Sequence, residues 1–202
     1  SSGLLKSLLK ESADKSFNRI TIDGDTSVCD KVLLLANGMS CAPEIKENTP
    51  EFDKFRQALT AVSIALAKMI AADGEGASKL IEIHVKNAKT PEDAHIAAKA
   101  VANSPLVKTA FYGEDANWGR ILTALGYCGV DFDPNKTSIK IGSLILYNNG
   151  IAIPFDEDSA KKTLEQKEII VSIDFCAGSF DTTVWTCDLS PEYIEINANY
   201  RT

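Results

Sequence analysis

Glu75 is the first residue whose surroundings suggest chemistry, because it lies between two glycines in Gly74-Glu75-Gly76. Hydrophobic periodicity predicts a helix over 52–72 upstream, and an apolar run predicts a strand over 80–85 downstream. The negative end of the helix dipole and its outward-pointing carbonyls suit a cation better than a phosphate. Glu75 is therefore a candidate partner for a substrate ammonium group. The same spacing allows an alternative, a helix C-cap with a solvated Glu side chain.

The segment Asn117-Trp118-Gly119-Arg120 places an amide, an indole and a guanidinium beside a glycine. Arginine suits bidentate contact with a carboxylate, whereas asparagine is favoured just before the first turn of a helix. The segment thus either lines a carboxylate pocket, or begins a helix with Asn117 as its cap and Trp118 in the core. The acidic turn Asp23-Gly24-Asp25 lacks the further spaced ligands of an EF-hand loop, which favours a simple turn over a cation site.

No other catalytic or metal-binding pattern stands out in the sequence. His84 falls within the predicted strand and His95 on an alanine-rich helix, and no cluster of His, Cys and Asp has the spacing of metal ligands. No GxSxG motif is present, and no Ser or Cys has the setting of a nucleophile. We therefore predict no catalytic residue and no metal site within these residues. The five cysteines form no CxxC pair, which favours reduced thiols in a cytosolic protein.

The length and composition are those of a globular protein. The 202 residues can form one domain or two small ones around a sizeable core. With 21 basic against 28 acidic residues the net charge is −7, and the lack of a long basic run argues against a nucleic-acid or anionic-membrane partner. No apolar stretch is expected to span a membrane, since the best one, 58–72, is interrupted by Thr60, Ser63 and Lys68. With no secretory signal, we expect a cytoplasmic protein.

Helices and strands alternate irregularly along the chain, which favours an α+β layered sandwich over a doubly wound sheet. Helices are predicted over 4–15, 52–72, 91–102, 118–127 and 158–164, and from 191 onward. Strands are predicted over 17–22, 31–36, 80–85, 106–111, 139–145, 169–175 and 182–187. The helix over 52–72 carries apolar residues around much of its circumference, which is typical of a helix between two layers.

Six motifs in the sequence occur together and in this order in one known family. They are residues 17–27 (FNRITIDGDTS), 34–38 (LLANG), 74–82 (GEGASKLIE), 104–110 (SPLVKTA), 113–121 (GEDANWGRI) and 196–202 (INANYRT). At these motifs the sequence resembles the β chain of ornithine acetyltransferase, the bifunctional enzyme of arginine biosynthesis. The resemblance covers essentially all 202 residues.

The resemblance implies a fold and a partner. It implies an αββα-type sandwich that is completed by a companion α chain, with an α+β C-terminal subdomain. Residues 1–87 would fold together with the α chain, and residues 88–202 would form the subdomain. The two chains would come from one self-cleaving precursor and remain together as an α2β2 heterotetramer.

The resemblance also implies an activity. In this family the N-terminal threonine of the β chain takes acetyl from N-acetylornithine and passes it to glutamate by a ping-pong route, with its own α-amine as base. The α chain supplies the oxyanion hole, no metal or organic cofactor is needed, and some members also use acetyl-CoA. The family's threonine-led segment has no counterpart here, so Ser1 and Ser2 are not assigned its role and the nucleophile is expected outside this chain.

Three residues match substrate-binding positions of the family: Glu75 in the glycine-flanked loop, and Asn197 and Thr202 near the end of the sequence. Ser78 stands where threonine is more common, which keeps the hydroxyl. Two other interpretations stay open. One is an amidase or aminopeptidase relative with the same N-terminal-nucleophile plan, which would not need this set of three residues. The other is a non-catalytic subunit.

Overall fold

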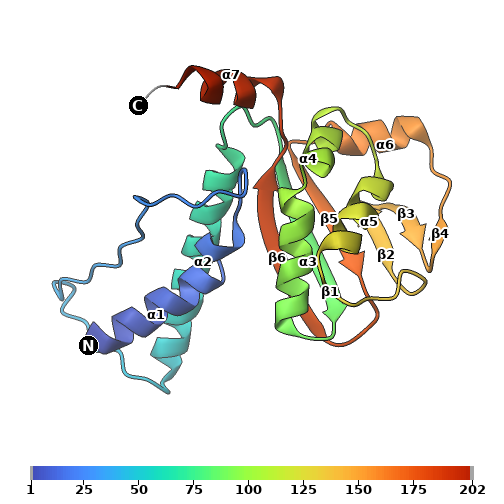
Figure 1. The fold of residues 1–202 in the computed structure, drawn as a ribbon. Helices are drawn as coiled ribbons and strands as arrows, with labels where there is room; N and C mark the ends of the chain where they lie inside the picture. Colours follow the sequence, from blue (N-terminus) through green and yellow to red (C-terminus); the bar gives the residue numbers. More distant parts are fainter. Residues whose placement is uncertain (1, 201–202) are drawn as a thin grey trace.

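The fold is built on one mixed six-stranded sheet in the order β4-β3-β2-β5-β1-β6 (Figure 1). The computed structural model describes residues 2–200. The longest strand, β1 (Leu80–Ala88), runs parallel to β5 (Glu168–Asp174) and antiparallel to the edge strand β6 (Phe180–Cys187). The remaining strands are β2 (Ser138–Ile141), β3 (Leu144–Asn148) and β4 (Ile151–Ala152). The predicted α+β class is confirmed.

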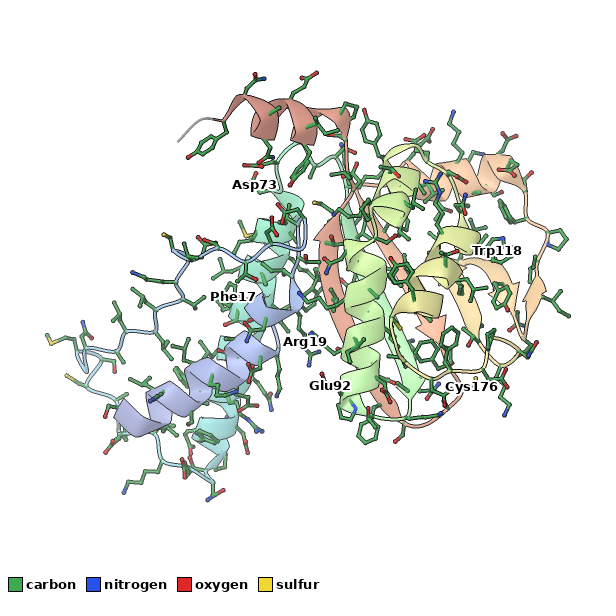
Figure 2. All side chains as sticks on the ribbon, in the orientation of Figure 1. Phe17, Arg19, Asp73, Glu92, Trp118 and Cys176 are labelled. Atoms are coloured by element: carbon green, nitrogen blue, oxygen red, sulfur yellow. The ribbon has the colours of Figure 1, made fainter. Side chains whose placement is uncertain are left out.

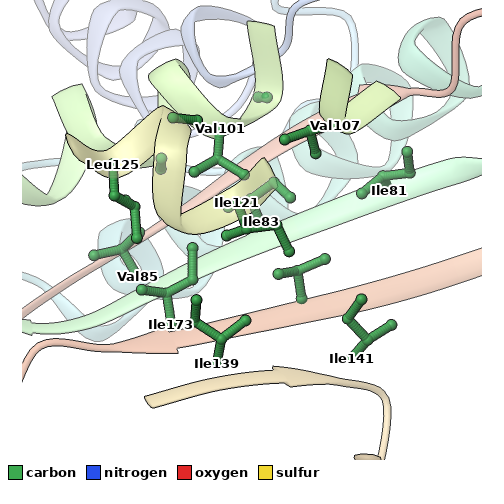
Figure 3. Close-up of a cluster of buried hydrophobic side chains, with 14 of the residues drawn as sticks. Ile81, Ile83, Val85, Val101, Val107, Ile121, Leu125, Ile139, Ile141 and Ile173 are labelled. Carbon is green, nitrogen blue, oxygen red and sulfur yellow. The ribbon is translucent and has the colours of Figure 1, made fainter. Parts of the chain in front are cut away.

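One face of the sheet carries the main core, shown in Figure 3. Ile81, Ile83 and Val85 of β1 point to this face at every second position and are fully buried. Three helices cover the core: α3 (Pro91–Asn103), α4 (Pro105–Tyr112) and α5 (Trp118–Tyr127). The short helix α6 (Glu157–Leu164) adds Ala160 and Leu164.

The opposite face of the sheet meets α2 (Pro50–Ala72) at its β1–β6 edge. A small cluster of Ala71, Leu80 and Trp185 joins them. The first helix, α1 (Ser2–Asp14), lies against α2 and away from the sheet, as Figure 1 shows. The last helix, α7 (Pro191–Asn199), lies beyond the end of α2.

Apolar residues around much of its circumference predicted that helix α2 lies between two layers. The described residues 2–200 do not enclose it in this way. It buries Ser63, Ala67 and Ala71, whereas Val62 and Met69 are 58% and 65% exposed. The prediction about membrane-spanning length is also corrected. By length and composition this 23-residue helix is apolar enough to cross a membrane, a test that the core helix of a soluble protein also passes.

Helix starts were predicted well because their capping is local. Thr49 and Thr90 each precede a proline, and their hydroxyls accept the backbone N–H groups of Phe52 and Asp93 at 3.2 and 3.0 Å. Ser104 does the same before Pro105, accepting the N–H of Val107 at 3.4 Å. The strand predicted over 106–111 is therefore wrong: this segment is α4.

Two other predicted strands are wrong. The segment 17–22 forms a 3-10 turn over Phe17–Arg19 and then a single bridge from Ile20 to Trp185. The segment 31–36 is irregular and exposed, and no strand among residues 2–200 pairs with it. An apolar run can form a strand only where a neighbour pairs its backbone groups.

The single strand predicted over 139–145 is two strands, β2 and β3, joined by a turn. Gly142 lies in that turn with φ +56°, a conformation that glycine adopts without strain.

Candidate functional site

The loop between α2 and β1 holds Glu75 at the end of the molecule nearest α7. Helix α2 ends at Ala72, and the N–H of the next residue, Asp73, donates to the carbonyl of Met69 at 3.0 Å. The next residues form a turn in which the N–H of Ala77 donates to the carbonyl of Gly74 at 2.9 Å. Figure 2 shows Asp73 where α2 meets this loop, next to α7. The helix end that the sequence predicted is thus confirmed.

The structure brings together Glu75 and Asn197, two of the three residues predicted to bind substrate. The Nδ2 atom of Asn197 donates to Glu75 Oε2 at 2.6 Å and to the carbonyl of Tyr193 at 3.0 Å. The other carboxylate oxygen of Glu75 has no hydrogen-bond partner within residues 2–200. The third residue, Thr202, lies outside the described residues. A carboxylate held by one oxygen and open at the other can accept an ammonium donor.

The surroundings of this pair are negative. The hydroxyl of Tyr193 donates to Asp23 Oδ2 at 2.9 Å. That hydrogen bond raises the pKa of Tyr193 to about 12, and burial and the charges of Asp23, Glu75 and Asp25 add to the effect. The acidic turn near the start of the chain therefore lies beside the loop of Glu75, where it favours a cation over an anion.

The acidic turn itself is an Asx turn, as the simpler interpretation predicted. Asp23 Oδ1 accepts the N–H of Asp25 at 2.9 Å, and its other oxygen is taken by Tyr193. Within residues 2–200 no group of three or more His, Cys, Asp or Glu side chains has the geometry of a metal site.

The structure decides between the two interpretations of residues 117–120. Asn117 caps α5 by accepting the N–H of Arg120 at 3.1 Å. Arg120 donates to the carbonyl of Leu106 at 2.7 Å, and Trp118 stacks on Tyr147 with ring centroids 5.2 Å apart. The guanidinium thus ties α5 to α4, and the segment serves the fold and not a carboxylate pocket.

Asp188 is a residue that the sequence analysis missed. It follows the end of β6, is 2% exposed, and accepts hydrogen bonds from Ser78 and Lys79 in the Glu75 loop. The neighbouring Lys108 is equally buried, and its amine donates to Thr186 Oγ1 at 3.0 Å. Burial lowers the pKa of Lys108. No local pattern marks either residue, because their partners are distant in sequence.

A second charged cluster lies on the sheet face under α2. Glu82 accepts hydrogen bonds from Trp185 Nε1 at 2.8 Å and from Lys68, and it pairs with His84 Nε2. These partners, His84 first, lower the pKa of Glu82 to about 2. Both oxygens of this carboxylate have hydrogen-bond or ion-pair partners within the molecule. The cluster therefore stabilises the contact between α2 and the sheet, and the carboxylate has little room to bind a ligand.

Comparison with known proteins identifies the family. The model of the ArgJ family matches residues 1–202. The arginine biosynthesis bifunctional protein ArgJ of Symbiobacterium thermophilum is 50% identical over 198 residues, which are 98% of this chain and 49% of that protein. The protein of the same name from Caldanaerobacter subterraneus subsp. tengcongensis is 50% identical over 202 residues, covering 98% of this chain and 50% of that protein. This chain spans about half the length of the curated relatives that it matches.

A solved structure shows the same fold. The crystal structure of arginine biosynthesis bifunctional protein ArgJ from Bacillus halodurans matches with a TM-score of 0.95 and 39% identity, covering 99% of this chain and 94% of that chain. The resemblance inferred from the six motifs is therefore confirmed. Because the family model matches every residue and a solved member shares the fold, this chain belongs to the ArgJ family of arginine biosynthesis proteins.

Proposed function

We propose that this chain is the β subunit of an ornithine acetyltransferase that moves an acetyl group from N-acetylornithine to glutamate. The observation that carries the proposal is the 2.6 Å hydrogen bond between Asn197 and Glu75, two residues 122 positions apart that both match substrate-binding positions of the family. The names of the relatives support a role in arginine biosynthesis. An amidase or aminopeptidase relative would have no need of this pairing.

In the proposed reaction this chain binds substrate, and the attacking group lies outside it. A threonine hydroxyl attacks the acetyl carbonyl while its own α-amine takes the hydroxyl proton. The bond from the carbonyl carbon to the ornithine nitrogen breaks, and ornithine leaves with that proton on its amine. The amine of glutamate then attacks the acetyl ester, which returns the threonine hydroxyl. Glu75 holds the free ammonium of N-acetylornithine, with Asn197 fixing one of its carboxylate oxygens.

The proposed partner is the α chain of the same precursor, in an α2β2 heterotetramer. Helix α2 leaves Leu66 and Ile70 47% and 49% exposed, next to Val62 and Met69. The irregular segment 24–49 adds a further set of exposed apolar side chains: Val28, Val32, Leu33, Leu35 and Met39. Large apolar side chains gathered in this way are typical of a surface that another protein chain covers. This surface supports the proposal that residues 1–87 fold together with the α chain, leaving 88–202 as the subdomain.

The proposal is tested with the full precursor that contains this chain. It is expressed in cells, purified from the cytoplasmic fraction, and assayed for acetyl transfer from N-acetylornithine to glutamate in the presence of a metal chelator. Acetyl-CoA serves as a separate donor, which decides whether this member is bifunctional. Exchange activity in a complex of two chains supports the proposal. Release of free acetate without transfer indicates an amidase, and an inert complex indicates a non-catalytic subunit.

Removal of residues 200–202 is expected to lower kcat/KM for N-acetylornithine by about tenfold, equivalent to one lost polar contact of about 1.4 kcal/mol. The physical reason is that the truncation deletes Thr202, which is proposed to bind substrate as Glu75 and Asn197 do. Steady-state kinetics of the truncated enzyme measure the effect. The control is Glu157→Gln, at an exposed residue of α6, which is not expected to change KM. Full kcat/KM in the 200–202 truncation would show that this tail is only structural.

A further inference from the structure

The carboxylate of Asp188 accepts hydrogen bonds from the loop between α2 and β1. Its Oδ1 atom accepts the backbone N–H groups of Ser78 at 2.8 Å and Lys79 at 2.9 Å, and its Oδ2 atom accepts the hydroxyl of Ser78. In return, the N–H of Asp188 donates to the carbonyl of Lys79. Removing a carboxylate from water is costly unless hydrogen bonds replace the water. Within residues 2–200, the bonds that replace the water come from Ser78 and Lys79, two and three residues after Gly76.

The same loop is held on its other side by the start of α7. Ser190 Oγ donates to the carbonyl of Gly76 at 2.7 Å. Gly76 has φ +66°, and a Cβ atom at this position would lie 2.7 Å from the backbone nitrogen of Tyr193. The loop backbone therefore lies directly against residues 188–193, which are the connection from β6 and the first residues of α7.

These contacts fix Glu75 relative to its partner on α7. Glu75 lies between Gly74 and Gly76, which supply little rigidity of their own. Its carboxylate nevertheless meets Asn197, which α7 presents one turn after Tyr193. Two anchors account for this alignment: Ser190 holds Gly76, and Asp188 holds Ser78 and Lys79 shortly after it.

We propose that Asp188 is a positioning residue that holds the loop so that the Glu75 carboxylate reaches the substrate ammonium. The inference rests on the proposed function of Glu75. It also gives a role to the hydroxyl at position 78, which is an O–H donor for Asp188 Oδ2.

The test uses the full precursor, with variants compared by steady-state kinetics at saturating glutamate. Asp188→Ala, which removes all three bonds, is expected to raise KM for N-acetylornithine about tenfold and to change kcat less than about threefold. Asp188→Asn keeps an oxygen for the two N–H groups and places an amide donor against the Ser78 hydroxyl, so it recovers most of the loss. Ser78→Ala removes one bond and has an intermediate KM.

The matched control is Asp181→Ala. Asp181 accepts the N–H of Asn87 at 2.9 Å, so it makes the same kind of strand-end contact at the opposite end of the β1–β6 pair. Its loss is expected to lower the thermal midpoint without changing KM. If Asp181→Ala and Asp188→Ala changed KM equally, the effect of Asp188 would be general destabilisation and the inference would be wrong.

A double-variant cycle separates this inference from the proposal on which it rests. If Asp188 acts through Glu75, the KM of Glu75→Gln/Asp188→Ala equals that of Glu75→Gln alone. Additive effects would overturn the inference and leave the role of Glu75 intact. An unchanged KM in Glu75→Gln would overturn the role of Glu75 and the inference together. Should Asp188→Ala fail to accumulate as cleaved protein, the cycle with Ser78→Ala gives the same decision.

Discussion

Glu75→Gln in the full precursor is expected to lower kcat/KM for N-acetylornithine by about 100-fold, because a hydrogen bond between charged groups contributes up to about 3 kcal/mol. The glutamine side chain has the size of the original and still offers an oxygen to Asn197 Nδ2, so the pairing with α7 survives. What disappears is the negative charge that the substrate ammonium meets. Self-cleavage of the precursor should proceed as in the wild type, since it involves no substrate ammonium.

Two comparisons make this expectation specific. N-acetylnorvaline has the carbon skeleton of N-acetylornithine without the terminal ammonium, so wild type and Glu75→Gln should use it equally poorly. Glu92→Gln is a matched control, since Glu92 is also an exposed glutamate and lies in the first turn of α3. Unchanged kinetics with N-acetylornithine in Glu75→Gln would leave the residue as a solvated helix C-cap, the alternative that its spacing also allowed.

The parts of the fold that the sequence predicted correctly depend on neighbours in the chain. A hydroxyl followed by proline at Thr49 and Thr90 specifies a helix start through atoms three residues away. The same chemistry at Ser104 begins a helix, α4, where the apolar run over 106–111 predicted a strand. Leu106 and Val107, with Ala110 and Phe111, recur at helical spacing, and the cap decides between a helix and a strand for such a short apolar run.

The parts that were predicted wrongly depend on partners that a pattern does not identify. The apolar residues over 31–36 indicate burial, but the described chain 2–200 provides no strand to pair with them. Helix α2 shows the same discrepancy, with Leu66 and Met69 exposed on a helix that was expected to be enclosed. Hydrophobic patterning indicates that side chains favour burial, and it does not identify the residues that would bury them.

The candidate site was predictable only in part, because some of its contacts are local in the chain and others join distant residues. The loop around Glu75 is a local feature, and its helix end and glycines are visible in the sequence. Its pairing with Asn197 spans 122 residues, and only the resemblance to a family linked the two. The contact of Asp188 with Ser78 spans 110 residues and had no signal of either kind.

Glu82→Gln is expected to destabilise the protein by about 2 kcal/mol at pH 7, because the pKa of Glu82 falls from 4.5 to about 2 in the folded state and each pKa unit corresponds to about 1.4 kcal/mol. The full shift would give about 3 kcal/mol, and partial exposure of Lys68 reduces it. The neutral amide also leaves Lys68 without its ion pair under α2. Thermal unfolding should show a midpoint lower by about 4–8 °C.

The pH dependence of this difference follows from the direction of the shift. A carboxyl whose folded pKa lies below its unfolded value contributes its full stability above pH 4.5 and loses it as the pH falls towards about 2. Wild type should therefore lose its advantage over Glu82→Gln progressively below pH 4.5. Glu168→Gln, at an exposed carboxylate of the neighbouring strand β5, is the control whose midpoint should stay close to wild type throughout. A constant gap between wild type and Glu82→Gln from pH 7 to pH 3 would mean that the charge of Glu82 does not contribute to stability, and that apolar packing of Ala71, Leu80 and Trp185 joins the helix to the sheet.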